Sequence, residues 1–361
     1  MSCKWKNNWA ETKKHFIDWW QRKGLVLSTW GGPRSSSPHA QTACPQMPES
    51  IKERYTNASW RSQYNHWKVS QEYFGADILP LPPTDIGPGS LALYLGSEPG
   101  FSERTVWFEP STMASLEHPE DLAPLRFSTE NHWWKITQEF LSASQKLANG
   151  NYLVGCPDLV ENIDILASLR GDQTLLMDLY DRPEWVHEKL SEINQAWFEA
   201  YDKIYDIIKL PDGSSAFWAF QLWGPEKTAK VQCDASAMLS PEMFREFVVP
   251  HLREQCEWLD NSLYHLDGHQ SLCHLDALFE IEALDAIEWT PDPKVPSGGS
   301  PEWYGLYRRI LAAGKSVQAF LYADELIPLL DAVGGKGMYL AVSFESEGQV
   351  EKLAEKVEQY R

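Results

Sequence analysis

Short apolar runs alternate with longer amphipathic runs along most of this chain, and this alternation constrains the fold more than any other feature of the sequence. The apolar runs end near Gly, Pro or Asp, and many stretches between them repeat apolar residues every three or four positions, as helices do. The runs with strand character occupy residues 25–30, 76–81, 103–109, 152–155, 216–223, 231–234, 263–267, 283–289, 316–321 and 337–342. Strands separated by helices pair in parallel, so the sequence predicts an α/β fold.

The chain length selects among the parallel architectures. With 361 residues, seven or eight helix-separated strands fit a closed (β/α)8 TIM-type barrel best, and an open doubly wound sheet is the alternative. We expect the barrel over residues 76–361, preceded by a helical segment over residues 1–75 that packs on it within one structural domain. The sequence has no G-x-G-x-x-G or G-K-[ST] loop, so nothing in it supports nucleotide phosphate binding.

Two of the long helices have clear start signals. Asp181 and Pro183 predict a helix start, and apolar residues then recur at helical spacing as far as position 208. Ser240 and Pro241 predict a second start, for a helix that runs to about residue 260. Pro250 lies inside that second helix and should bend it, because proline has no backbone N–H.

The charge balance excludes two classes of partner. The chain has 51 acidic and 32 basic residues, a net charge of −19, and such a surface repels nucleic acid and anionic membranes. The six Cys residues form no C-x-x-C pair, no apolar run is long enough to cross a bilayer, and the opening residues lack the apolar core of a signal peptide. We therefore expect a cytoplasmic protein.

Three His and two Asp residues are concentrated within residues 264–276, where an apolar run meets a Gly and then a helix-like pattern. His265 and Asp267 are two positions apart, so on a strand both point to the same side. In α/β enzymes such residues at the carboxyl end of a strand line the active site. The pair is expected to share a metal ion or to bind substrate directly, and a hydrogen-bonded rim pair is the structural alternative.

Several motifs resemble the uroporphyrinogen decarboxylase superfamily. They are residues 240–250 (SPEMFREFVVP), residues 166–171 (LASLRG), and residues 181–186 (DRPEWV), which occur in the family's order and spacing over about residues 150–345. Residues 265–268 (HLDG) fall where relatives of the corrinoid methyltransferases carry a His-x-Cys-Gly zinc motif. The resemblance implies a TIM-type barrel with its site at the carboxyl-end mouth. It also implies either tetrapyrrole decarboxylation or methyl transfer between a corrinoid protein and a thiol.

Two departures from the family pattern narrow this expectation. Residues 28–34 (STWGGPR) stand in place of the Met-Arg-Gln-Ala-Gly-Arg stretch of the decarboxylases, which argues against decarboxylation. Residues 340–345 (LAVSFE) lack the late Cys that is the third zinc ligand of the methyltransferases. A site made of His265 and Asp267, with Glu345 or water, would hold zinc or another divalent metal through a harder ligand set. Any corrinoid would arrive only on a partner protein, since the Asp-x-His-x-x-Gly corrinoid motif is missing.

Other residues follow predicted strands and are expected at the same mouth. Asp234 joins His265 and Asp267 as a catalytic candidate, because a carboxylate there can act as acid or base. The substrate-binding candidates are Trp223, Cys233, Trp289, Asp158 and Gln318. Each of these taken singly also fits a purely structural role.

Three functions are compatible with these residues. A methyltransferase-like enzyme acting on a small molecule is favoured. A carbohydrate-active barrel enzyme would use the paired carboxylates of Asp234 and Asp267. A non-catalytic protein would hold a corrinoid or tetrapyrrole in the mouth. The partners considered are a small-molecule substrate, a corrinoid protein and a second copy of the chain.

Overall fold

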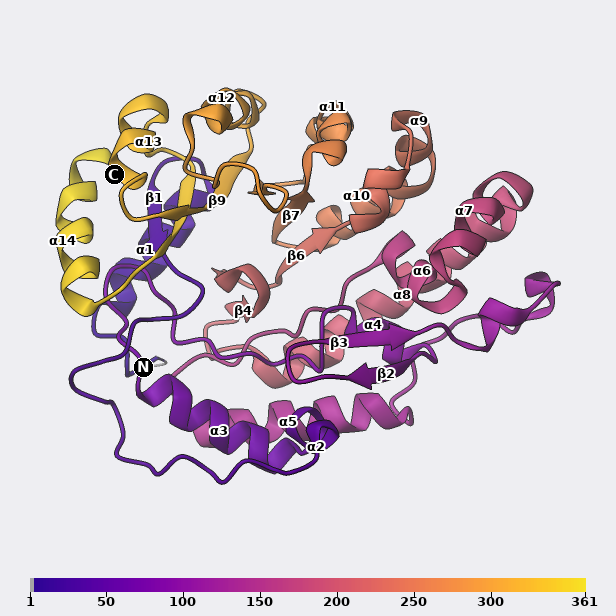
Figure 1. Ribbon diagram of the computed structural model, residues 1–361, viewed down its shortest axis with the longest axis horizontal. Coiled ribbons are helices and arrows are strands. Elements are labelled where there is room, and N and C mark those ends of the chain that lie inside the picture. Colours follow the sequence, from indigo (N-terminus) through magenta and orange to yellow (C-terminus); the bar gives the residue numbers. More distant parts are fainter. Residues whose placement is uncertain (1–2) are drawn as a thin grey trace.

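Six parallel strands form the central sheet of the protein. The computed structural model describes residues 3–361; Met1 and Ser2, which begin the segment expected to lack a signal peptide, lie outside the described residues. The strands lie in the order β1, β10, β9, β8, β7, β6, and each neighbouring pair is parallel (Figure 1). Their bounds are β1 Leu25–Ser28, β6 Thr228–Gln232, β7 Asn261–Asp267, β8 Ala286–Thr290, β9 Ser316–Tyr322 and β10 Met338–Ser343.

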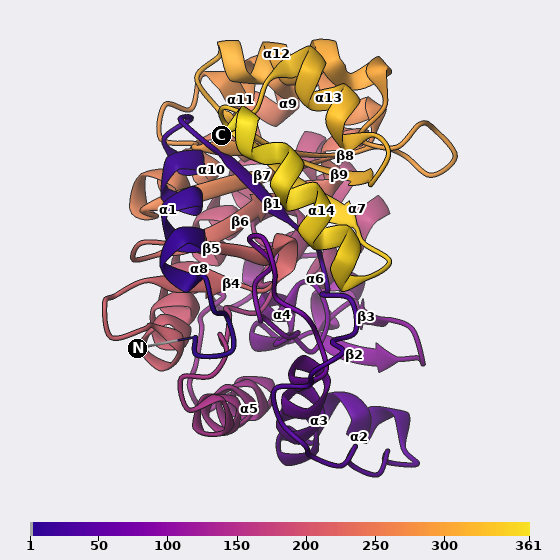
Figure 2. The same ribbon diagram turned by 90° about the vertical axis from the view of Figure 1, so that its left-hand side faces the viewer.

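Two antiparallel hairpins accompany the sheet. They are made of β2 Glu98–Phe101 with β3 Val106–Glu109, and of β4 Ser215–Phe217 with β5 Leu222–Gly224. The helices are α1 Trp9–Trp20, α2 Ile51–Thr56, α3 Ala58–Ser70, α4 Ser90–Tyr94, α5 His132–Ala148, α6 Asn162–Arg170, α7 Asp172–Asp181, α8 Pro183–Ile208, α9 Pro241–Met243, α10 Val249–Trp258, α11 Leu275–Phe279, α12 Tyr304–Ala312, α13 Leu326–Val333 and α14 Glu347–Val357. Helices α9, α11, α12 and α13 lie along one edge of the molecule, and α3 and α5 lie along the opposite edge (Figures 1 and 2).

Single hydrogen bonds continue the sheet beyond β1. The Asp77 amide donates to the Leu27 carbonyl at 2.9 Å, and the Leu153 amide donates to the Pro80 carbonyl at 2.9 Å. Cys156 forms a parallel bridge to β4. The hydrogen-bonded ladder thus comprises six strands, which confirms an α/β fold with a parallel sheet, whereas closure into an eight-stranded barrel stays a prediction.

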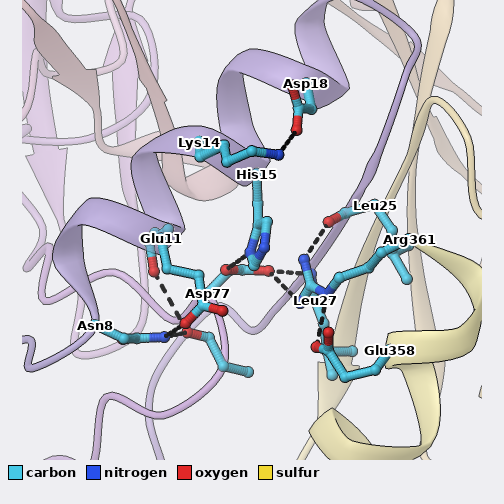
Figure 3. A network of polar contacts seen from close by, with 12 residues as sticks. Asn8, Glu11, Lys14, His15, Asp18, Leu25, Leu27, Asp77, Glu358 and Arg361 are labelled. Carbon is cyan, nitrogen blue, oxygen red and sulfur yellow. Dashed lines mark hydrogen bonds and ion pairs between the residues drawn. The ribbon is translucent and has the colours of Figure 1, made fainter.

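Residues 3–75 supply a strand of the central sheet in addition to the expected helices. Strand β1 pairs with β10 along its whole length and forms one edge of the central ladder. Helix α1 packs beside it, and the buried carboxylate of Asp77 joins both to the end of the chain through His15 and Arg361 (Figure 3). The predicted division at residue 75 therefore separates segments that share one sheet.

The helix predicted from residue 240 to about residue 260 is divided at Pro250. Helix α9 leads into a π-helical turn at Phe244–Val248, and α10 begins at Val249. Pro250 thus directly follows the π-helical turn, a local irregularity that fits the missing backbone N–H of proline. The predicted helix start at Ser240 is confirmed, since its side chain accepts a hydrogen bond from the Met243 amide.

The described part of the chain offers no helix that is both long enough and apolar enough to span a bilayer. The cysteines are unpaired, with Cys44 and Cys273 exposed and Cys3, Cys156, Cys233 and Cys256 buried.

Candidate active site

The register of the sheet places a row of polar side chains on one face. Gln232 pairs with His265, His265 with Glu288, Glu288 with Gln318, and Gln318 with Tyr339. Register partners on neighbouring parallel strands project to the same side of a sheet. All five side chains are largely buried, so this face encloses polar chemistry rather than an apolar core.

Three side chains at the carboxyl end of this face form the metal-type cluster: Asp234, His265 and Asp267. One ligand atom of each lies within 4.8 Å of the others. Asp267 ends β7 on the same side as His265, and Asp234 begins the 3₁₀ helix that follows β6. Both carboxylates are exposed, and the imidazole between them is partly buried. The structure thus brings together the three residues that the sequence predicted as catalytic.

Glu288 orients the imidazole of His265. Its Oε2 lies 2.5 Å from Nδ1 of His265, and its Oε1 accepts a hydrogen bond from the Thr290 hydroxyl at 2.8 Å. Burial lowers the pKa of His265, but the charge and hydrogen bond of Glu288 outweigh it and the net pKa is raised. With Nδ1 engaged by a carboxylate, Nε2 is left for a ligand, as in the carboxylate–histidine pairs of metal sites.

Glu288→Gln is expected to weaken the metal-type cluster without removing a ligand. The amide keeps the shape of the side chain but not the charge, so we expect the pKa of His265 to fall and the affinity for Zn²⁺ to drop about 10- to 100-fold. An NMR titration of the His265 ring and a calorimetric Zn²⁺ titration measure the two effects. An unchanged pKa would show that Glu288 does not set the state of the imidazole.

Asp164 fixes the segment that carries Asp234. Its Oδ2 accepts a hydrogen bond from the Asp234 amide at 2.8 Å, and its Oδ1 accepts one from the Ala235 amide at 2.9 Å. Burial, reinforced by the charge of Asp234, raises the pKa of Asp164 to about 6. Burial also raises the pKa of Asp267, with contributions from Asp234 and Asp292 that His265 opposes. Carboxylates thus crowd this end of the sheet.

A cavity of about 540 Å³ opens beside Asp234. It is bounded by α6, by the segment after β6 and by the β2–β3 hairpin through Phe108. Asp164, Asp172 and Asp234 line it, and its lining residues include no Lys, Arg or His. The cavity has room for a small molecule and favours a positively charged one.

The turn of the β4–β5 hairpin covers the centre of the polar face. Phe220 and Gln221 have positive φ angles of 62° and 52°, a conformation that costs free energy in residues with side chains. The turn is held because Gln318 donates to the Phe220 carbonyl at 2.8 Å and Tyr339 donates to the Gln221 carbonyl at 2.9 Å. The Phe220 ring then lies 4.7 Å from the His265 ring.

None of the predicted substrate residues lines the cavity beside Asp234. Trp223 is buried against Trp9 of α1, and Trp289 is buried against Trp303 on the outer side of β8. Cys233 is buried between Gln232 and Asp234, and burial raises the pKa of its thiol. The ammonium of Lys230 engages Asp158 at 2.7 Å in the interior. Gln318 faces the interior, where it holds the hairpin turn.

Two further residues differ from expectation. Glu345, proposed as the third metal ligand, is exposed beyond β10, and Asp234 instead completes the cluster. Glu288 was missed by the sequence analysis, although it is the one acidic residue in the apolar run 286–289. A lone carboxylate in such a run is the signal that marks it, because burying it requires a partner.

Gly268 makes the turn that ends β7 directly beyond Asp267. Its φ is +74°, and a Cβ there would lie 2.8 Å from Oδ1 of Asp292, which is bound to His269. Gly268→Ala is expected to destabilise the fold by about 1–3 kcal/mol. Gly305→Ala is the matched control, since Gly305 is helical with open space around it and Ala there should stabilise by up to about 1 kcal/mol. Urea unfolding measures the free energy of unfolding of both variants. Equal changes in the two would contradict the steric and conformational strain expected of Ala at position 268.

Comparison with known proteins agrees with an α/β fold with a parallel sheet. No protein-family model and no curated protein sequence matches the chain. Among solved structures, the fold is similar to that of a methyltransferase from Methanosarcina mazei, with a TM-score of 0.61 and 10% identity over 96% of this chain and 98% of the other. At this identity the similarity concerns the fold.

Proposed function

We propose that this protein is a methyltransferase-like enzyme that acts on a small molecule, with a divalent metal ion bound by Asp234, His265 and Asp267. The observation that carries the proposal is the convergence of these three side chains within 4.8 Å at the carboxyl edge of the sheet. Its support from outside the chain is the full-length similarity of the fold to a methyltransferase. The carboxyl edge is where enzymes with parallel sheets place their chemistry.

The donor set suits a catalytic metal ion. One imidazole nitrogen and two carboxylate oxygens are accepted by Zn²⁺, and three protein ligands leave a position open for substrate. The set contains no thiolate, so it also accepts harder divalent ions. A bound ion would supply Lewis acidity, which lowers the pKa of a coordinated thiol or hydroxyl. Glu288 would hold the imidazole in place through its contact with Nδ1 of His265.

The proposal also includes a closed barrel, a superfamily, a protein partner and an oligomeric state. A closed eight-stranded barrel is supported by the hydrogen bonds that extend the sheet from β1 through residues 77–81 and 153–156. Membership in the uroporphyrinogen decarboxylase superfamily rests on the motifs at residues 166–171, 181–186 and 240–250. We further propose a corrinoid protein as the partner that exchanges the methyl group, and a homodimer as the form of the enzyme.

Methyl transfer from methylcobalamin to 2-mercaptoethanol tests the proposal. The purified protein, incubated with Zn²⁺ and dialysed, is expected to retain metal by elemental analysis and to change the visible spectrum of methylcobalamin. Asp234→Asn should abolish both results, whereas Asp276→Asn should leave them unchanged, because Asp276 is exposed and pairs with Arg309 away from the metal-type cluster. A protein that retains no metal and remains silent with methylcobalamin and thiols would refute the proposal.

Glycoside cleavage is a second candidate, favoured by the separation of the carboxylates. Oxygens of Asp234 and Asp267 lie within 4.8 Å of each other, and retaining glycosidases hold their two carboxyl groups about 5 Å apart. The two functions are separated by the metal requirement. Hydrolysis of an aryl glycoside that persists with excess chelator would favour the glycosidase, and methyl transfer that the chelator abolishes would favour the methyltransferase.

A further inference from the structure

The two carboxylates of the metal-type cluster are held by the sheet to different degrees. Asp267 is the last residue of β7 and pairs in register with Thr290 of β8. The ladder between β6 and β7 ends earlier, at the pair of Gln232 and His265, so Asp234 lies beyond the last residue of β6 that the sheet holds. Contacts outside the sheet must therefore fix the distance between the two carboxylates.

Buried polar contacts join the two segments that carry these carboxylates. Ser236 lies two residues after Asp234, in the 3₁₀ helix that follows β6. Ser271 and His274 lie in the 3₁₀ helix that follows β7. The hydroxyl oxygens of Ser236 and Ser271 are 3.0 Å apart, and Nε2 of His274 lies 2.9 Å from the Ser236 carbonyl oxygen. All three side chains are at most 2% exposed, so these bonds are shielded from water.

The imidazole of His274 is fixed both in place and in protonation. A carbonyl oxygen only accepts, so Nε2 must carry the hydrogen of the bond to Ser236. The ring stacks on the buried Phe244, with the centroids 4.2 Å apart and an angle of 19° between the planes. Burial lowers the pKa of His274 more than the bond to Ser236 raises it, so the ring is neutral near pH 7. The same nitrogen lies 3.5 Å from the exposed thiol of Cys273, which donates to the Gln270 carbonyl.

We propose that His274 is a positioning residue of the metal-type cluster, which sets the distance between Asp234 and Asp267 by tying their two segments together. A metal site requires its ligands to be held to within about 0.5 Å, so the segment of Asp234 has to be fixed on more than one side. Asp164 holds it to α6, and His274 with Ser271 holds it to the segment that follows β7. The inference rests on the proposed function, because it assigns a role in holding the metal ligands.

Calorimetric Zn²⁺ titration of three single variants tests the inference. His274→Leu keeps much of the bulk of the side chain and removes the donor, so the affinity for Zn²⁺ should fall about 10-fold, as after loss of a residue that holds a metal ligand. His274→Gln can present an amide N–H in place of Nε2, so its affinity should stay within about threefold of the parent. Cys273→Ala is the matched control, because Cys273 is the exposed neighbour in the same 3₁₀ helix, and it should leave the affinity unchanged.

Amide hydrogen exchange of the protein without metal gives a second readout, which a failure to bind Zn²⁺ does not affect. The amides of residues 234–239 should exchange about 5-fold faster in His274→Leu, the effect of one lost hydrogen bond, and at the parent rate in His274→Gln. The amides of β7 should keep the parent rate in both variants, which separates a local loosening from a loss of fold.

Equal losses of Zn²⁺ affinity in His274→Leu and His274→Gln, or faster exchange throughout β7 in His274→Leu, would overturn the inference. A parent protein that binds Zn²⁺, with a His274→Leu variant equal to it in affinity or in exchange, keeps the proposed function and loses this inference. A parent protein that binds no Zn²⁺ loses the proposed function. The link between the two segments then still stands if residues 234–239 exchange faster in His274→Leu and not in His274→Gln.

Discussion

His265→Ala is expected to lower the affinity for Zn²⁺ by more than about 100-fold and to abolish methyl transfer. Loss of an outer-shell partner already costs about 10- to 100-fold in metal affinity, and this change removes a ligand itself. The two carboxylates that remain would face each other within 4.8 Å without the nitrogen between them. Two of the three protein ligands of a catalytic zinc site would then remain, so the variant should bind the ion weakly.

The matched control is His269→Ala. His269 is also a histidine at the end of β7, and it bonds Asp292 at 2.5 Å on the exposed side of the turn. Its removal should leave the Zn²⁺ affinity within about threefold of the parent protein, because surface pairs of this kind contribute little. Calorimetric titration of both variants gives the comparison, and a His265→Ala protein that keeps the parent affinity would place the metal elsewhere.

Asp77→Asn is expected to destabilise the protein by about 3–5 kcal/mol, the cost of breaking a buried charge pair from one side. The fully buried Asp77 carboxylate engages Nδ1 of His15 at 2.7 Å through one oxygen. Its other oxygen accepts from the Leu27 amide at 3.0 Å and from Arg361 at 3.1 Å (Figure 3). An amide would present N–H to one of these donors and leave Arg361 with the more exposed Glu358 as its counterion.

The destabilisation caused by Asp77→Asn should become smaller as the pH falls. Burial raises the pKa of Asp77, but the hydrogen bond from His15 and the charge of Arg361 outweigh it, so the folded-state pKa lies below the ordinary value of 3.8. A group with a depressed pKa stabilises the fold above its unfolded value and loses that contribution as the pH falls through the folded value. The stability gap between the parent and Asp77→Asn should therefore be full near pH 7 and shrink below about pH 4.

Asp212→Asn is the control for this experiment. Asp212 pairs at 3.3 Å with Lys13, which lies on helix α1 as His15 does. Both side chains of this pair are substantially exposed. Such a pair contributes at most about 1 kcal/mol. Urea unfolding at pH 7 and at pH 3 measures both variants, and an Asp77→Asn protein no less stable than Asp212→Asn at pH 7 would contradict the role given to the buried network.

The sequence predicted the sheet and the convergence of Asp234, His265 and Asp267 because both depend on local patterns. Strand β7 is an apolar run ended by Asp267 and Gly268, and residues two apart on a strand share a side, which placed His265 and Asp267 together. Asp234 follows β6 in the same way. Glu288 was not found because its contact with His265 crosses between strands that are 23 residues apart in the sequence.

Trp223 and Trp289 lie away from the predicted mouth, each for a specific structural reason. Residues 216–223 were predicted as one strand ending at Trp223, but the chain reverses between β4 and β5, which turns Trp223 away from the mouth. The reversal uses positive φ at Phe220 and Gln221 without a glycine, and no residue pattern announces such a turn. Trp289 lies near a strand end, as predicted, but its neighbour Glu288 faces inward, so the alternation of side chains along β8 directs Trp289 outward.

Anomalous diffraction from crystals of the protein soaked in Zn²⁺, recorded at the zinc absorption edge, tests the central claim most directly. We expect one dominant peak about 2.0–2.2 Å from Nε2 of His265 and from carboxylate oxygens of Asp234 and Asp267. A dominant peak bound by other residues, or none at this site with Zn²⁺ in excess, would contradict it.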